Sequence, residues 1–227
     1  MEYRTFFPAG QAGHSDLTRD TIARALNSRG PRPHPRSDAE TSSRLAQSRD
    51  GGLPPPAATP VPAAVLVPLV RRDDGLTVLL TQRTAHLAHH PGQISFPGGR
   101  QEEADADPTA AALRETEEEI GLPPGAIDIL GRLDDYVTVT NFRIVPVVGM
   151  ITPPFTLAPD SFEVKDVFEV PLSFILDPVN HQRHSRDTPS GEKRFFYAMP
   201  YQDRYIWGAT AAILVNLYEA LCDRCAS

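Results

Sequence analysis

Runs of apolar and β-branched residues alternate along this chain with polar stretches rich in turn residues. Runs that favour extended backbone predict strands at residues 62–70, 77–82, 94–96, 127–140, 142–152, 164–170, 180–186 and 194–199. Runs that favour helix predict helices at 108–120, 172–176 and 206–222. Strands before and after a central helix, with another helix at the end, favour an α/β fold in which a mixed sheet lies between helical layers.

The most sharply bounded of these helices is the central one, at 108–120. Asp107 is a typical N-cap residue, and Pro108 suits the first helical position because its missing N–H would be unpaired there anyway. An Ala-rich run of good helix formers follows. Gly121 favours the left-handed turn that ends a helix, so both ends of this element are predicted by local signals.

Three glutamates share one face of this helix. At about 100° per residue, Glu115, Glu118 and Glu119 fall within roughly a third of the circumference, whereas Leu113 and Ile120 fall on the opposite side. Carboxylates this close repel one another and raise one another's pKa. A divalent cation removes the conflict, and Mg²⁺ and Mn²⁺ prefer carboxylate oxygen. The alternative interpretation of such a charge run is a solvated acidic face.

Residues 1–60 differ in composition from the rest of the chain. They hold eight of the 23 prolines, with many Arg, Ser and Ala residues and few large apolar ones. A short helix is predicted at 17–26, with Ser15 or Asp16 as its N-cap. The zone as a whole is expected to be a flexible leader whose removal leaves any activity nearly intact, and residues 61–227 are expected to form the folded domain.

The charge and cysteine content exclude several classes of protein. The formal net charge is −7, and because residues 1–60 carry +2, the remainder carries −9. An acidic domain argues against a nucleic-acid partner, but not against a small anion bound beside a metal. No apolar run reaches the length of a membrane span, and no signal-peptide core is present. Two cysteines give no disulfide framework, so we expect a cytoplasmic protein, monomeric or homodimeric, without a membrane partner.

Two glycines precede the acidic helix, and a compact set of charges fills its second half. Gly98 and Gly99 allow backbone to approach a ligand closely. The sequence Arg-Glu-Thr-Glu-Glu-Glu-Ile-Gly-Leu follows at 114–122. This arrangement resembles the Nudix box, the signature helix of the Nudix hydrolases.

The chain departs from the usual box at two points. Thr116 stands where the box usually has an aliphatic residue. The interval from Gly99 to Arg114 is one residue longer than usual, so the early glutamate of the box has no direct match. Asp105 lies nearest to it, and we leave that role unassigned.

A second motif lies upstream of the box. The sequence Leu-Leu-Thr-Gln-Arg at 79–83, then Gly92, then Phe-Pro-Gly-Gly at 96–99, resembles the signature of the coenzyme A pyrophosphatase subfamily of Nudix hydrolases. The subfamily often has Arg where this chain has Ala88, and Ser or Ala where it has Thr84. The resemblance extends from about residue 63 to residue 222.

The resemblance implies a fold and a metal site. It implies the Nudix α/β/α sandwich, with a mixed sheet between helical layers. By similarity, Glu115 and Glu119 are expected to bind Mg²⁺ or Mn²⁺, followed by Glu118 and the carbonyl group of Gly99.

The resemblance also implies residues for catalysis and for substrate binding. Arg114 is expected to orient the glutamates, and the general base is expected to be Glu118 or Glu163. A surface carboxylate with no catalytic role remains an alternative for Glu163. The residues on the substrate side are expected to be Arg83, Gly92, Phe96, Pro97 and Gly98, with support of the fold as the alternative for Phe96 and Gly92.

The implied activity is metal-dependent hydrolysis of coenzyme A or its thioesters to 3′,5′-ADP and a 4′-phosphopantetheine product. One alternative is a Nudix hydrolase of another nucleoside diphosphate derivative, such as ADP-ribose. Another is a module that senses nucleotides without turnover. The intact set of Arg114, Glu115, Glu118 and Glu119 favours an enzyme, because a binder has no need of a face that collects metal.

Overall fold

The computed structural model of the protein describes residues 17–28, 32, 34–46, 59–87, 91–188 and 191–222. Its helices are α1 (Arg19–Asn27), α2 (Asp38–Ala46), α3 (Pro108–Ile120), α4 (Leu172–Leu176) and α5 (Ala209–Cys222), with 3-10 turns at Pro124–Ala126 and Pro178–Asn180. Its strands are β1 (Arg36–Ser37), β2 (Val61–Arg72), β3 (Gly75–Arg83), β4 (Ile94–Ser95), β5 (Gly98–Arg100), β6 (Ile127–Arg132), β7 (Tyr136–Val137), β8 (Phe142–Ile151), β9 (Val164–Pro171), β10 (Gln182–Asp187), β11 (Lys193–Tyr201) and β12 (Arg204–Trp207).

The main sheet is mixed and has nine strands. Its longest path runs β1-β7-β8-β2-β3-β4, while β5 pairs with β2, β6 with β8 and β9 with β3. The β2–β8 pair is parallel over 61–70 and 142–151, and β2 and β3 form an antiparallel hairpin. The strands β10, β11 and β12 form a separate antiparallel sheet.

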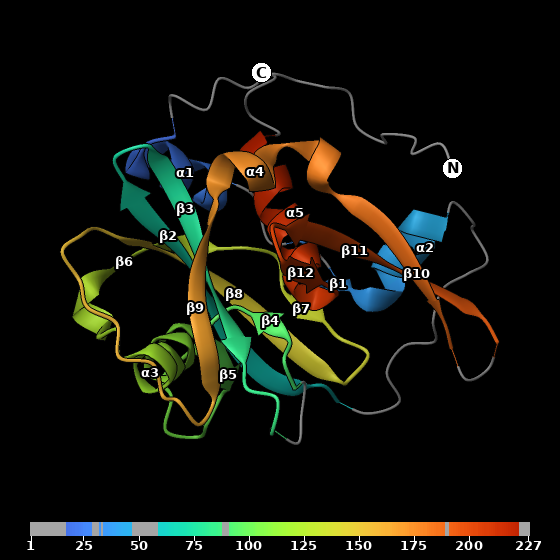
Figure 1. The fold of residues 1–227 in the computed structure, drawn as a ribbon, viewed down its shortest axis with the longest axis horizontal. Coiled ribbons are helices and arrows are strands. Elements are labelled where there is room, and N and C mark those ends of the chain that lie inside the picture. Colours follow the sequence, from blue (N-terminus) through green and yellow to red (C-terminus); the bar gives the residue numbers. More distant parts are fainter. Residues whose placement is uncertain are drawn as a thin grey trace.

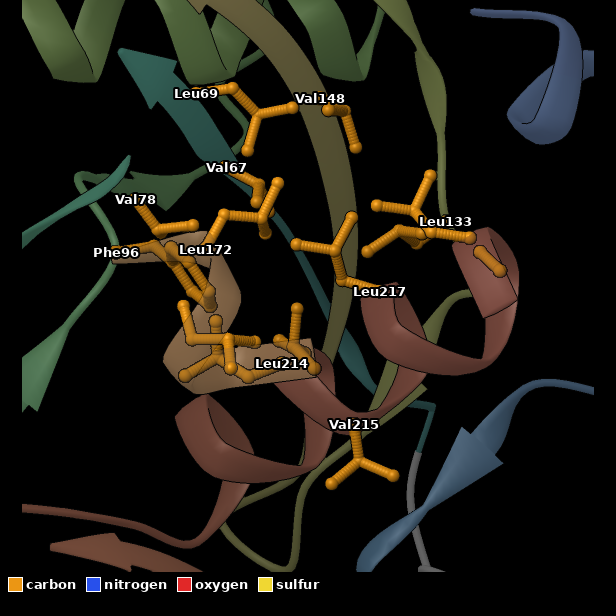
Figure 2. Packing of buried hydrophobic residues seen from close by; sticks show 14 of the residues in the cluster. Val67, Leu69, Val78, Phe96, Leu133, Val148, Leu172, Leu214, Val215 and Leu217 are labelled. Atoms are coloured by element: carbon orange, nitrogen blue, oxygen red, sulfur yellow. The ribbon is translucent and has the colours of Figure 1, made fainter. Parts of the chain in front are cut away.

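Alternation along β2 divides the core into two layers. Val67 and Leu69 point to the cluster that includes α1, α4 and α5, and Leu66 and Val70 point to the cluster that includes α3. Figure 2 shows the first cluster, with side chains of β2 and β8 facing Leu217 and its neighbours on α5. Figure 1 shows α3 on one side of the sheet and α5 on the other. The expected mixed sheet between helical layers is confirmed.

The ends of α3 follow the local signals in the sequence. The Asp107 side chain accepts hydrogen bonds from the backbone N–H groups of Thr109, at 2.6 Å, and Ala110, at 3.0 Å. Gly121 adopts the left-handed conformation at φ 70° and closes the helix. Thr116 and Ile120 are fully buried against the sheet, so the opposite face of α3 is left for its carboxylates.

The expectation of a flexible leader over residues 1–60 is wrong for α1 (Arg19–Asn27) and for the segment 36–46 that forms β1 and α2. The predicted short helix is present as α1, and its cap is Thr18, whose side chain accepts a hydrogen bond from the Thr21 N–H. The predicted caps, Ser15 and Asp16, lie outside the described residues. Ile22 and Leu26 of α1 are buried in the main core. Few apolar residues suffice here, because a two-turn helix needs only one buried stripe to attach to the domain.

Ion pairs attach β1 and α2 to the domain. Arg36 contacts Asp134 at 2.8 Å and Glu219 at 2.6 Å, and all three side chains are at most 16% exposed. Asp38 accepts hydrogen bonds from Tyr136 Oη at 2.9 Å and contacts Arg194 at 2.8 Å. Composition alone suggested a solvated segment, whereas these charges are buried and paired. Removal of residues 1–60 would therefore take away part of the core and several buried ion pairs.

Two predicted elements have different bounds in the structure. The strand expected at 127–140 is interrupted at 133–135. Arg132 pairs with Val147 and Tyr136 pairs with Ile144, so this segment holds one residue more than the facing segment of β8. Within it, Asp135 forms an ion pair with Arg143 at 2.6 Å. The helix expected at 206–222 begins at Ala209, because Gly208, at φ 65°, separates it from β12. Across the described residues, no helix has both the length and the apolar character needed to cross a bilayer.

Candidate active site

The backbone of β5 lies directly against the acidic face of α3. The Gly98 N–H donates a hydrogen bond to Glu119 Oε2 at 3.3 Å. A Cβ atom at Gly99 would collide with the carboxylate of Glu115, and one at Gly98 would collide with the backbone of β2. Gly98 is therefore required for β5 to fit against β2, whereas a side chain at Gly99 would displace the carboxylate of Glu115.

Glu119 is a buried acid at the centre of this arrangement. Glu119 is only 5% exposed to solvent. Burial raises the pKa of Glu119 to about 8, although Arg83 and the Gly98 N–H lower it. Arg83 Nη1 lies 3.5 Å from Glu119 Oε1. Burial also raises the pKa of Glu115, against the effect of Arg114. A nearby cation would favour the ionised form of both carboxylates and so lower their pKa values.

Arg114 joins three carboxylates on the outer side of α3. Its Nη1 atom lies 3.0 Å from Glu115 Oε1 and 3.1 Å from Glu118 Oε2. Its Nε and Nη2 atoms each donate to one oxygen of Asp105, both at 3.1 Å, and Nη2 also donates to the carbonyl oxygen of Arg100. This bidentate pair fixes the guanidinium group, and its hydrogen bonds hold the pKa of Asp105 below the ordinary value.

Glu163 approaches the site from the loop before β9. Its Oε2 atom lies 3.7 Å from Arg83 Nη2, and its side chain is 43% exposed. The backbone carbonyl of Glu163 accepts a hydrogen bond from the N–H of Thr84 at 2.9 Å. Arg83 thus lies between Glu119 and Glu163, and the structure brings together both loop and helix carboxylates.

The residues expected on the substrate side divide into two groups. Arg83 and Gly98 contact Glu119, as described above. Phe96 is 3% exposed in the core, and Pro97 is also buried, so their burial favours support of the fold, the alternative already given for Phe96, over contact of these side chains with substrate. Figure 2 shows Phe96 beside Val78. Gly92 forms a turn at φ 70°, and its carbonyl accepts a hydrogen bond from Gln82 Nε2 at 3.4 Å.

The oxygen ligands of these carboxylates suit a divalent metal, although the present spacing of the side chains does not form a metal site. Among the described residues, no three His, Cys, Asp or Glu side chains stand close enough together to hold a metal ion as they are. The oxygens of Glu119 and Glu115 form ion pairs with Arg83 and Arg114 instead. Burial nevertheless raises the pKa of both Glu115 and Glu119, and hard carboxylate oxygens suit Mg²⁺ or Mn²⁺. The donor set is therefore compatible with such a metal.

Asp105 is a member of the site for which the sequence predicted no role. Asp105 lies in the loop before α3, and its side chain is 5% exposed because it pairs with Arg114. The longer interval between Gly99 and Arg114 concealed this pairing, since the box offered no matching position. The signal that remained in the sequence was an acidic residue in the loop before a helix that carries an arginine.

The sequence of this chain is similar to those of known proteins. The family profile described as NUDIX domain matches residues 60–186. The chain is 44% identical over 161 residues to the uncharacterized Nudix hydrolase NudL of Enterobacter sp. strain 638, covering 68% of this chain and 80% of that protein. It is 42% identical over 157 residues to NudL of Escherichia coli strain K12, with the same coverage.

Solved structures give a weaker likeness. An Ap4A hydrolase of C. elegans in a binary complex is 20% identical, with a TM-score of 0.43, over 49% of this chain and 80% of that one. A MutT/nudix family protein from Enterococcus faecalis is 16% identical, with a TM-score of 0.46, over 96% and 76%. The profile match and the NudL relatives establish that this chain belongs to the Nudix family.

Proposed function

We propose that this chain hydrolyses the pyrophosphate bond of coenzyme A or its thioesters, releasing 3′,5′-ADP and a 4′-phosphopantetheine product. One observation carries the proposal: the two sequence motifs meet at a single carboxylate. Arg83, from the motif at 79–83, and Gly98, from the motif at 96–99, both contact Glu119 of the box. The convergence supports a joint role for the upstream motif and the box in one substrate site.

The reaction makes clear demands on the protein. Water must attack a phosphorus atom surrounded by negative oxygens, so neutralisation of charge and positioning matter more than covalent chemistry. In this proposal Glu115, Glu119 and the carbonyl group of Gly99 hold Mg²⁺ or Mn²⁺, and Glu118 stands at the edge of that group. When bound, such a metal offsets phosphate charge and lowers the pKa of water.

The remaining residues orient groups or move the proton. Arg114 keeps Glu115 and Glu118 in place through its contacts at 3.0 and 3.1 Å. Glu118 or Glu163 accepts the proton that water loses as its oxygen bonds to phosphorus, while the bond from that phosphorus to the bridging oxygen breaks and the second phosphate group leaves with that oxygen. Both side chains reach solvent, at 60% and 43% exposure, as a base that passes its proton onward requires. Arg83, freed from Glu119 in the loaded site, is available to a phosphate oxygen.

The test compares substrates on purified protein. Initial rates with Mg²⁺ are measured for coenzyme A and for ADP-ribose, and the products are identified by mass. We expect a higher kcat/KM for coenzyme A, with 3′,5′-ADP as one product. Faster turnover of ADP-ribose would overturn the assignment to coenzyme A while leaving a Nudix hydrolase of another nucleoside diphosphate derivative.

A further inference from the structure

One arginine beside the carboxylate site has no acidic partner. Arg100, the last residue of β5, is exposed, and its guanidinium group lies 5.4 Å from the centroid of the Phe142 ring. Within the part of the chain that the structure describes, no carboxylate forms an ion pair with it. By contrast, Arg83 and Arg114 each contact two or more carboxylates. The guanidinium group of Arg100 is therefore available to an anion from solution.

The backbone of Arg100 is part of the carboxylate site. Its carbonyl oxygen accepts a hydrogen bond from Arg114 Nη2 at 3.1 Å, and the same guanidinium group contacts Glu115 at 3.0 Å. Arg100 also directly follows Gly99, which lies against the carboxylate of Glu115. Because consecutive Cα atoms are about 3.8 Å apart, the Arg100 side chain begins one residue from the carbonyl group proposed as a metal ligand.

The Arg100 side chain leaves the sheet on the face opposite α3. The register pairs Ala63 of β2 with Arg100, and it pairs Val61, two residues earlier on β2, with Phe142. Residues two apart on a strand point to the same face, so Arg100 and Phe142 stand together on one face of the sheet. Gly99, the neighbour of Arg100, faces the acidic side of α3 instead. Only the backbone of β5 separates the two sides.

A ligand can contact both sides by passing the edge of β5. This strand has three residues and pairs with β2 along one edge, and no second described strand pairs with it. Gly98 and Gly99 have no side chains, so nothing but backbone lies between the acidic face of α3 and the Arg100 side. Figure 1 shows β5 beside α3. A ligand that extends past this edge can therefore place one group at the carboxylates and another at Arg100.

The distribution of charge indicates which group of the substrate reaches Arg100. The acidic face of α3 repels any phosphate that a metal does not neutralise. The guanidinium groups of Arg83 and Arg114 already contact carboxylates. Coenzyme A carries its pyrophosphate and its 3′-phosphate on the same ribose, so the 3′-phosphate needs a cation that is close to the site but outside the acidic face. A guanidinium group suits a phosphate because it can donate two parallel hydrogen bonds.

We propose that Arg100 binds the 3′-phosphate of coenzyme A and so determines a preference for coenzyme A over its 3′-dephospho form. This inference rests on the proposed function, because it names the residue that recognises one end of that substrate. The pyrophosphate lies at the acidic face of α3, and the nucleoside part passes the edge of β5 towards Phe142. The Phe142 ring holds the guanidinium group in place and leaves its N–H groups to the phosphate.

Lys165 is the competing cation near the site. It is exposed at the start of β9, two residues after Glu163, and it has no ion pair within the described ranges. An ammonium group on a flexible stem binds phosphate as a point charge, whereas the guanidinium group of Arg100 is planar and lies over a ring. Lys165→Gln therefore makes the same change of charge near the site and serves as the control for Arg100→Gln.

The first test compares coenzyme A with 3′-dephospho-coenzyme A, which lacks only this phosphate. We expect the wild type to have a kcat/KM at least about tenfold higher for coenzyme A, the scale of one charge-assisted hydrogen bond. Arg100→Gln should lose most of this preference and keep its rate on the dephospho form. Lys165→Gln should keep both. An equal loss on the two substrates in Arg100→Gln would show a merely structural role and overturn the proposal.

Binding without turnover gives an independent readout. Adenosine 3′,5′-bisphosphate and adenosine 5′-monophosphate are titrated into each protein with Mg²⁺, and the heat is recorded. We expect the wild type and Lys165→Gln to bind the bisphosphate at least about tenfold more tightly, and Arg100→Gln to bind the two compounds with similar affinity. Equal affinities in the wild type, or a preference that survives in Arg100→Gln and is lost in Lys165→Gln, would overturn the proposal.

The outcomes distinguish this inference from the proposed function. Equal turnover of coenzyme A and its dephospho form by the wild type would overturn the role of Arg100 while coenzyme A hydrolysis stands. A wild type that turns over neither compound, yet binds the bisphosphate more tightly than the monophosphate through Arg100, would refute the proposed function and support the phosphate site. Circular dichroism verifies that each variant folds.

Discussion

Without metal, Glu119 is expected to lower the stability of the protein in a manner that depends on pH. Its pKa is about 8 in the folded protein, against an ordinary value of 4.5. The folded state therefore binds more protons than the unfolded state between these values, and the free energy of unfolding falls as the pH rises through that window. The slope is about 1.4 kcal/mol per pH unit, so the loss at pH 7 is about 3 kcal/mol.

Glu119→Gln removes this ionisation while it keeps a similar shape and one oxygen that can accept from the Gly98 N–H. We expect the variant to match the wild type near pH 4 and to be more stable by about 3 kcal/mol at pH 7. Urea unfolding in EDTA, from pH 4 to pH 8, measures the difference. Glu117→Gln is the control, because it makes the same charge change at an exposed position of the same helix. A difference that stays constant with pH, or a variant less stable at pH 7, would refute this reasoning.

Three further predictions concern packing and metal. Ile22→Ala should lower the free energy of unfolding by about 2–5 kcal/mol, whereas Arg24→Ala, on the exposed side of α1, should change it by less than about 0.5 kcal/mol, as urea unfolding would reveal. Gly99→Ala should reduce kcat more than about tenfold in a protein with normal circular dichroism, because the methyl group displaces the Glu115 carboxylate. Adding Mg²⁺ should raise the melting temperature of the wild type, and raise that of Glu119→Gln much less, in a thermal shift assay.

Local signals in the sequence were sufficient to predict the bounds of α3 and the helical layers on both faces of the sheet. Asp107 and Gly121 act through groups within a few residues of themselves, so the bounds of the helix are as predicted. The division of β2 into two buried faces follows from strand geometry and a long apolar run. The spacing of the glutamates alone was compatible with either a metal site or a solvated acidic face. The resemblance of the box to a known family favoured the metal site.

Long-range pairing explains what the sequence could not reveal. Arg36 pairs with residues about 100 and 180 positions away, so its burial has no local signature. Asp105 needed the three-dimensional path of the loop before α3 to meet Arg114. Phe96 belongs to a motif that resembles a substrate loop, yet its side chain fills the core. In each case, the side chain's partner lies on another element.

The turnover of Glu119→Gln tests the central claim, that the acidic face of α3 performs metal-dependent hydrolysis, most directly. We measure kcat on coenzyme A with saturating Mg²⁺ for the wild type, Glu119→Gln and Glu117→Gln. The account predicts a loss of at least about a hundredfold for Glu119→Gln, the scale of one preorganised electrostatic group. It predicts a change of less than about twofold for Glu117→Gln, which is exposed and lies off the acidic face. Near-wild-type turnover by Glu119→Gln, or greater damage from Glu117→Gln, would contradict it.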